Sequence, residues 1–192
     1  MSVKKFYFDT ETTGFDPEKN DIIELSAIIE VDNEVKESFT FFIQPRNWEH
    51  ISPEALAVNG YKEEDLKNFT APGDAYKALI EKLKAYVDQY DRNDKFIVVG
   101  YNVRFDMDML RGFFNKCGDK YFGSWFYSNY FLDVYQMAMI ARYMGKFRHW
   151  ETMKLGDVAK ALRIDLDNYD LHKGSDDIAL TRRVFQKFIE MF

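Results

Sequence analysis

The sequence predicts an α/β fold in which a mixed five-stranded sheet is flanked by helices. Three strand-like segments follow one another early in the chain with no helical periodicity between them, which indicates an antiparallel meander. Strand-like and helix-like segments then alternate, which is typical of parallel strands joined by helices. We expect the strands near residues 3–9, 21–31, 35–44, 96–100 and 129–133.

Size and composition favour a single domain spanning residues 1–192. The 192 residues include 46% hydrophobic and 17% aromatic residues, enough to form one sizeable core. No linker-like run rich in Pro, Gly or Ser divides the chain. One cysteine, Cys117, excludes an internal disulfide and is consistent with a reducing cytoplasm.

Two predicted strands and one predicted helix before the fourth strand each have a distinct hydrophobic pattern. Phe6-Tyr7-Phe8 is short, apolar and aromatic, which indicates a strand buried on both faces. The alternation along residues 37–43 indicates an antiparallel edge strand with one buried face. A long amphipathic helix is then predicted from the apolar positions Ala75, Leu79, Leu83, Tyr86 and Tyr90.

Two acids end the first strand. Asp9 and Glu11 are two residues apart, so their side chains point the same way, and Thr12-Thr13-Gly14 predicts a tight turn after them. Neighbouring carboxylates repel each other, and burial strengthens the repulsion. A hard divalent cation such as Mg²⁺ removes that cost, so the pair predicts a metal site. For an Asp-x-Glu alone, a solvated strand end would be the simpler interpretation.

A third acid begins the helix after the fourth strand. The apolar strand ends in Gly100, and Asp106 falls in the first turn of the following helix, where the helix dipole favours an anion. The buried stripe of this helix is predicted to contain Phe105, Met109 and Phe113. Asp108 lies about 200° around the helix from Asp106 and cannot face the same site.

The last helix follows a histidine and two acids. Its inward stripe is predicted to be Ile178, Thr181, Phe185, Phe188 and Phe192. Ser175 is predicted to cap this helix, with Asp176 and Asp177 in the first turn, and capping alone would explain the serine and one acid. We expect the neighbouring acids to keep the pKa of His172 near neutrality, which a general base needs, although an exposed loop histidine is the alternative.

In this order, the motifs resemble those of the DnaQ-like (DEDDh) 3′–5′ exonucleases, the family of the proofreading epsilon subunit of DNA polymerase III. Residues 9–14 match the family pattern Asp-x-Glu-x-Thr-Gly, and residues 102–106 match Asn-x-x-Phe-Asp. His172 and Asp177 match a histidine followed five residues later by an aspartate. The resemblance implies the ribonuclease H-like fold.

Two positions depart from the family pattern. Gly174 stands where the family usually has alanine, two residues after the histidine. Asn59 precedes Gly60 where the family often has a histidine.

The resemblance implies hydrolysis with two divalent cations, Mg²⁺ or Mn²⁺, held about 3.5–4 Å apart. Asp9, Glu11 and Asp177 would hold the first ion. Asp9 would bridge to the second, which Asp106 would ligate through water. His172 would accept the proton of the attacking water.

The resemblance also implies the residues that contact the substrate. Thr12, Thr13 and Gly14 would bind the terminal nucleotide through backbone and hydroxyl groups. Asn102 would contribute to the same subsite. Phe105, which also suits core packing, and Phe15 would wall or stack the terminal base.

The expected activity is 3′–5′ hydrolysis of single-stranded or frayed nucleic acid, with DNA favoured and nucleoside 5′-monophosphates as products. The net charge of −6 taken alone argues against a nucleic-acid binder, but bound cations invert the charge at a site. An RNA-trimming exoribonuclease and a proofreading or accessory subunit of a polymerase or replication complex are alternatives. We expect no membrane association, because no apolar stretch approaches the ~20 residues of a span, and a cytoplasmic location, because no signal peptide is evident.

Overall fold

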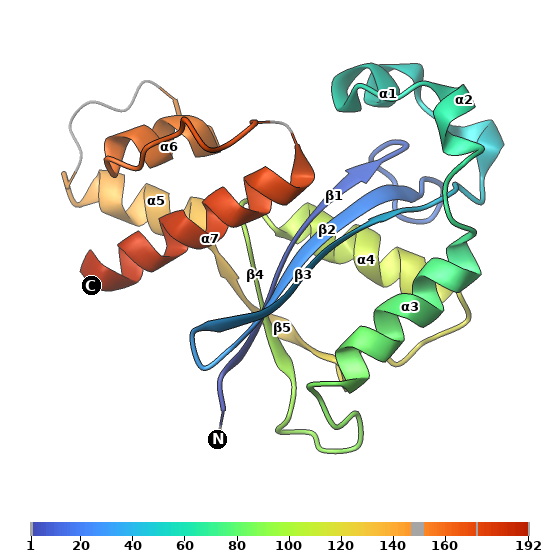
Figure 1. Ribbon diagram of the computed structural model, residues 1–192, viewed down its shortest axis with the longest axis horizontal. Coiled ribbons are helices and arrows are strands. Elements are labelled where there is room, and N and C mark those ends of the chain that lie inside the picture. Colours follow the sequence, from blue (N-terminus) through green and yellow to red (C-terminus); the bar gives the residue numbers. More distant parts are fainter. Residues whose placement is uncertain (1, 147–151, 172, 192) are drawn as a thin grey trace.

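A computed structural model describes residues 2–146, 152–171 and 173–191, apart from the side chain of Ser128. Its strands form one mixed sheet in the order β3-β2-β1-β4-β5 (Figure 1), which confirms the predicted fold class. The strands are β1 (Lys4–Thr12), β2 (Ile22–Val31), β3 (Glu34–Phe42), β4 (Phe96–Gly100) and β5 (Phe126–Asp133). The helices are η1 (Trp48–His50), α1 (Pro53–Asn59), α2 (Glu63–Leu66), α3 (Pro72–Lys84), α4 (Arg104–Lys116), η2 (Phe122–Ser124), α5 (Val134–Tyr143), α6 (Leu155–Ala161) and α7 (Gly174–Met191).

Strand β1 is the centre of the sheet. It pairs antiparallel with β2 and parallel with β4, while β3 and β5 form the two edges. Both long edges of β1 are therefore paired and both faces are covered by helices. Phe6, Tyr7 and Phe8 are almost completely buried as a result, which confirms the prediction for this segment.

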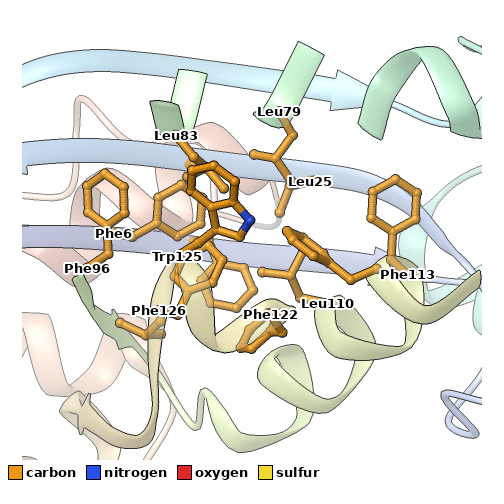
Figure 2. Close-up of a cluster of buried hydrophobic side chains, with 14 of the residues drawn as sticks. Phe6, Leu25, Leu79, Leu83, Phe96, Leu110, Phe113, Phe122, Trp125 and Phe126 are labelled. Carbon is orange, nitrogen blue, oxygen red and sulfur yellow. The ribbon is translucent and has the colours of Figure 1, made fainter. Parts of the chain in front are cut away.

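Alternation along β1 divides the core into two layers. Phe6 and Phe8 point toward α3 and α4, where an aromatic cluster that includes Trp125 fills the space (Figure 2). Tyr7 points to the opposite face, which is covered by α5, α6 and α7 (Figure 1). Successive residues of β1 thus face different helices, and this determines where its acids point.

Helix α3 is shorter than its apolar pattern predicts. It ends at Lys84, and Tyr90, the last residue of the predicted stripe, lies in the loop beyond it with 88% of its surface exposed. Two lysines satisfy the carbonyl groups of this loop: Lys4 Nζ donates to Tyr86 O, and Lys95 Nζ donates to Gln89 O over 3.1 Å. These bonds replace the ones that a longer helix would supply.

Helix α7 also begins differently from the prediction. It starts at Gly174, so Ser175 lies inside the helix and is not its N-cap. Ile178, Thr181, Phe185 and Phe188 are buried as predicted, whereas Phe192 lies outside the described residues. Among the helices that the structure describes, none combines the length and the hydrophobicity needed to cross a bilayer.

Candidate active site

Strand β1 carries Asp9 and Glu11 at its carboxyl-terminal end. Glu11 is paired across the ladder with Glu24 of β2, and Asp9 with Ser26. Asp9 and Glu11 are two and four residues beyond Tyr7, so their side chains point to the same face of the sheet as Tyr7, the face covered by α7. The prediction that these two side chains project together is consistent with this register.

Asp106 reaches the same end of β1 from the first turn of α4. Its carboxylate is buried, and Oδ1 accepts hydrogen bonds from Thr10 N over 3.0 Å and from Thr10 Oγ1 over 2.7 Å. Thr10 is the residue between Asp9 and Glu11. One residue of β1 therefore holds the third acid beside the first two.

The turn that leads into α4 is tight. A Cβ on Gly100 would lie 2.5 Å from Val103 Cγ2, so only glycine fits there. Asn102 adopts a left-handed conformation with φ 57° and donates its N–H to Asp133 Oδ1 over 2.9 Å. Its side chain is exposed at the start of α4. Asp108 bonds to Arg104 on the outer surface, as the helical spacing predicts.

Asp177 comes from the first turn of α7, and its N–H bonds to Lys173 O over 2.9 Å. Its charge raises the pKa of both Asp9 and Glu11, which places it within electrostatic reach of them. His172, the predicted general base, lies outside the described residues.

Burial and mutual repulsion raise the pKa values of the clustered acids. Burial is the largest cause for Asp9, whose pKa lies well above the usual range, and the charge of Asp106 is the next. The pKa of Glu11 rises to about 7 through burial and the charge of Glu24. Burial raises the pKa of Asp106 to about 6 against the opposing hydrogen bonds from Thr10.

The clustered acids offer the oxygen ligands of a metal site, but they do not form a preformed coordination site. Among the residues described, no three His, Cys, Asp or Glu side chains are arranged to hold a metal ion. Carboxylate oxygens are nevertheless the ligands that Mg²⁺ and Mn²⁺ prefer, and carboxylates without a cation repel one another. The charge and the oxygen chemistry of the cluster therefore fit a hard divalent cation.

Glu24 also belongs to this region, although it was not predicted from the sequence. Glu24 is 8% exposed, and its carboxylate accepts hydrogen bonds from the Tyr61 hydroxyl and from Ser26 Oγ. The signal was a buried acid, one of two with Glu30, within the largely apolar strand β2. A buried glutamate needs partners, and its position opposite Glu11 could have indicated that they lie near the site.

The predicted nucleotide contacts gather in the turn after β1. Thr12 Oγ1 donates to Gly14 O over 2.8 Å, and Thr13 Oγ1 accepts from Asp21 N over 2.9 Å, so both hydroxyls have partners within the protein. Phe15 is 84% exposed, and its ring centroid lies 6.0 Å from that of Phe105.

Helix α1 and the residues after it lie beside this turn (Figure 1). Asn59 Nδ2 donates to Thr12 O over 2.9 Å. Asn59, one of the two departures from the family pattern, thus binds the backbone of the turn.

Comparison with known proteins gives a family from the sequence and a matching fold from the structure. A family model described as "Exonuclease" (RNase_T) matches residues 6–185. The PolC-type DNA polymerase III of Thermotoga petrophila is 26% identical over 183 residues, which are 95% of this chain and 12% of that protein. Ribonuclease T of Shewanella baltica is 25% identical over 115 residues, covering 57% of this chain and 51% of that protein.

Among solved structures, E. coli exonuclease I in complex with a dT13 oligonucleotide aligns with a TM-score of 0.74 and 20% identity. The alignment covers 98% of this chain and 41% of that protein. This likeness supports the fold. The chain thus spans only part of the length of the relatives that it matches.

Proposed function

Because the chain belongs to the exonuclease family of DnaQ-like enzymes with a ribonuclease H-like fold, we propose that it is a metal-dependent 3′–5′ exonuclease. It would release nucleoside 5′-monophosphates from the 3′ end of single-stranded or frayed nucleic acid, with DNA favoured. One observation carries the proposal most strongly: acids from β1, α4 and α7 gather at one end of β1, and their charges raise the pKa values of Asp9 and Glu11.

The proposed cofactors are two divalent cations, Mg²⁺ or Mn²⁺, held by Asp9, Glu11, Asp106 and Asp177. Bound there, such cations would activate water and stabilise the charge on the departing oxygen. The protein's own contribution is to hold the carboxylates in place. Thr10 does this for Asp106 through two hydrogen bonds, of 3.0 and 2.7 Å.

We propose His172 as the general base. Replacing it with alanine should lower the rate by about 10²–10⁴-fold, the usual contribution of general acid–base catalysis, without changing metal affinity. Single-turnover kinetics of His172→Ala would measure the loss. A rate near that of wild type would assign the proton transfer to another group.

The terminal nucleotide is proposed to bind against the turn after β1. The exposed ring of Phe15, backed by Phe105, offers a surface on which a base can stack. Backbone groups of residues 12–14 and the exposed Asn102 side chain are proposed to contact the same nucleotide. The oligonucleotide held by E. coli exonuclease I, a protein of the same fold, supports a single-stranded substrate.

Two alternatives follow from the relatives. Similarity to ribonuclease T favours RNA 3′-end trimming as the second candidate activity. Similarity to a region that makes up 12% of a PolC-type polymerase favours a proofreading role within a replication complex. We also propose that residues 1–192 form one exonuclease domain and act in the cytoplasm.

Digestion of 5′-labelled oligonucleotides with Mg²⁺ or Mn²⁺ tests the proposal, using DNA and RNA of the same sequence. A linear strand with a free 3′-hydroxyl should be shortened stepwise, faster as a single strand than as a matched duplex because fraying an end costs free energy. A 3′-phosphate or a circular strand should resist. The relative rates on DNA and RNA decide between the two activities, and efficient cutting of circles would refute exonuclease action.

A further inference from the structure

Glu24 is a buried acid beside the proposed metal ligands, with a distinct set of partners. It lies directly opposite Glu11 in the β1–β2 ladder and is 8% exposed. Directly opposed residues of an antiparallel pair have Cβ atoms about 4.5–5.5 Å apart, and like charges there repel. Among the described Lys and Arg residues, none forms a salt bridge with Glu24.

Neutral hydroxyl groups hold the Glu24 carboxylate instead. The Tyr61 hydroxyl donates to Oε2, and Ser26 Oγ donates to Oε1 over 3.1 Å. Ser26 Oγ lies in turn 2.9 Å from Thr40 Oγ1 of β3. Hydrogen bonds to a carboxylate acceptor are strong, so these two bonds hold the Glu24 carboxylate in one orientation.

Tyr61 connects this acid to the segment beside the substrate turn. It follows α1 and Gly60, and its ring packs against Phe69 with the centroids 5.6 Å apart. Asn59, two residues earlier, bonds to the backbone of Thr12. The same short segment is thus fastened both to the turn after β1 and to the acid opposite Glu11.

Because Gly174 has no side chain, the Glu24 carboxylate can occupy the space beside it. A Cβ built on Gly174 would lie 2.6 Å from Glu24 Oε1 and 2.9 Å from Ser26 Oγ. Alanine at this position, which is usual in the family, would displace the carboxylate from its present place. The glycine and the Tyr61–Glu24 hydrogen bond are therefore two parts of one arrangement.

We infer that Tyr61, Glu24 and Gly174 form a positioning unit for the metal ligands: Tyr61 fixes the Glu24 carboxylate opposite Glu11, and Glu24 directs Glu11 toward the bound cation. The negative charge of Glu24 also strengthens cation binding. This inference rests on the proposed function, because it assigns the unit to the same site. Glu24 and Tyr61 act through Glu11 and touch neither substrate nor cation.

Calorimetric titration with Mn²⁺, together with steady-state kinetics, tests the unit. Tyr61→Phe removes one hydrogen bond to a charged group and should weaken Mn²⁺ binding by about tenfold or more. The same variant should lower kcat by a similar factor with KM little changed. Glu24→Gln, which keeps the shape and removes the charge, should weaken Mn²⁺ binding by about tenfold.

Tyr76→Phe is the matched control. The Tyr76 hydroxyl also donates to a carboxylate, that of Asp119 at 2.5 Å, but Asp119 lies beyond the end of α4 opposite to Asp106. A purely structural loss should lower the melting temperature of both Tyr→Phe variants and leave Mn²⁺ binding unchanged in both. The positioning unit predicts that only Tyr61→Phe changes Mn²⁺ binding.

Gly174→Ala extends the test to the third member. It should weaken Mn²⁺ binding in the wild-type background and much less in Tyr61→Phe, since a released Glu24 can move away from the new methyl group. Unchanged Mn²⁺ binding in both Tyr61→Phe and Glu24→Gln, or additive effects with Gly174→Ala, would overturn the inference while wild-type hydrolysis upholds the proposed function. A wild-type protein that neither binds Mn²⁺ nor digests oligonucleotides would refute both.

Discussion

Buried acids at the two ends of the β1–β2 strand pair differ in their charged neighbours and in the direction of their pKa shifts. At one end Glu30, with 1% of its side chain exposed, accepts from Lys5 Nζ and from Arg182 Nε, each over 2.6 Å. Burial raises the pKa of Glu30, but the hydrogen bonds and charges of these two cations outweigh it and hold the pKa below its usual range. At the other end Glu11 faces Glu24, and the pKa of Glu11 rises to about 7.

The difference separates a structural acid from acids suited to a ligand. Glu30 has its counter-cations built into the chain, so its charge is neutralised whenever the protein folds. Among the described residues, Asp9, Glu11 and Asp106 form no salt bridge with Lys or Arg. Their repulsion must be relieved by protons or by a cation from solution. Removing an acid should therefore damage activity at one end and stability at the other.

The largest effect is expected from Asp9→Asn or Glu11→Gln. Each should lower the rate of oligonucleotide hydrolysis by about 10³-fold or more, because a proposed metal ligand is lost. The melting temperature of the metal-free protein should hold or rise slightly, since one source of repulsion disappears. Activity assays and thermal unfolding of the same preparations measure both. Full activity in either variant would remove the acid pair from the mechanism.

At the opposite end, Glu30→Gln should reverse this pattern. Loss of a buried acid leaves Lys5 and Arg182 without their partner and should lower the free energy of unfolding by about 3 kcal/mol. Hydrolysis per folded molecule should stay near the wild-type value. Chemical denaturation and a rate corrected for the folded fraction test this prediction.

Glu34→Gln is the control for this end, because its salt bridge to Lys36 lies at the surface and its loss should leave stability unchanged. A Glu30→Gln protein as stable as wild type would show that the buried pair is not a structural element.

A smaller effect is expected in the pH dependence of the metal-free protein. The folded-state pKa of Glu11, about 7, lies above its unfolded value, so the folded state binds more protons between about pH 4.5 and 7. Its contribution to stability is present below that window and is lost as the pH rises through it.

Replacing Glu11 with Gln should remove about 1–3 kcal/mol of this decline. Denaturant titrations in EDTA at pH 5, 6, 7 and 8 compare the two slopes. If the free energy of unfolding changes with pH equally in wild type and Glu11→Gln, ionisation of Glu11 does not destabilise the folded state.

The fold was largely predictable because its signals are local. The apolar run Phe6-Tyr7-Phe8 indicates a strand covered on both faces, and the apolar stripe along α7 indicates a helix packed on one side. The errors occur where distant side chains decide the outcome. Lys4 and Lys95 cap carbonyls beyond α3, and no pattern within residues 85–90 indicates that they do so.

The site was predictable in its acids and less so in what holds them. Spacing and helix position indicated Asp9, Glu11 and Asp106, and the family resemblance added Asp177. The bonds from Thr10 to Asp106 cross 96 positions of the chain, and the bond from Tyr61 to Glu24 crosses 37. Such contacts depend on how β1, β2 and α4 pack in three dimensions.

The most direct test of the contrast between the two ends is the effect of Mg²⁺ on thermal unfolding at pH 8. A ligand present at a hundred times its dissociation constant stabilises the folded state by about 2.7 kcal/mol, so the wild-type melting temperature should rise by several degrees. The rise should disappear in Asp9→Asn and persist in Glu30→Gln. A wild-type melting temperature that Mg²⁺ leaves unchanged, or an equal rise in Asp9→Asn, would contradict the claim that the acids at the carboxyl end of β1 bind an external cation.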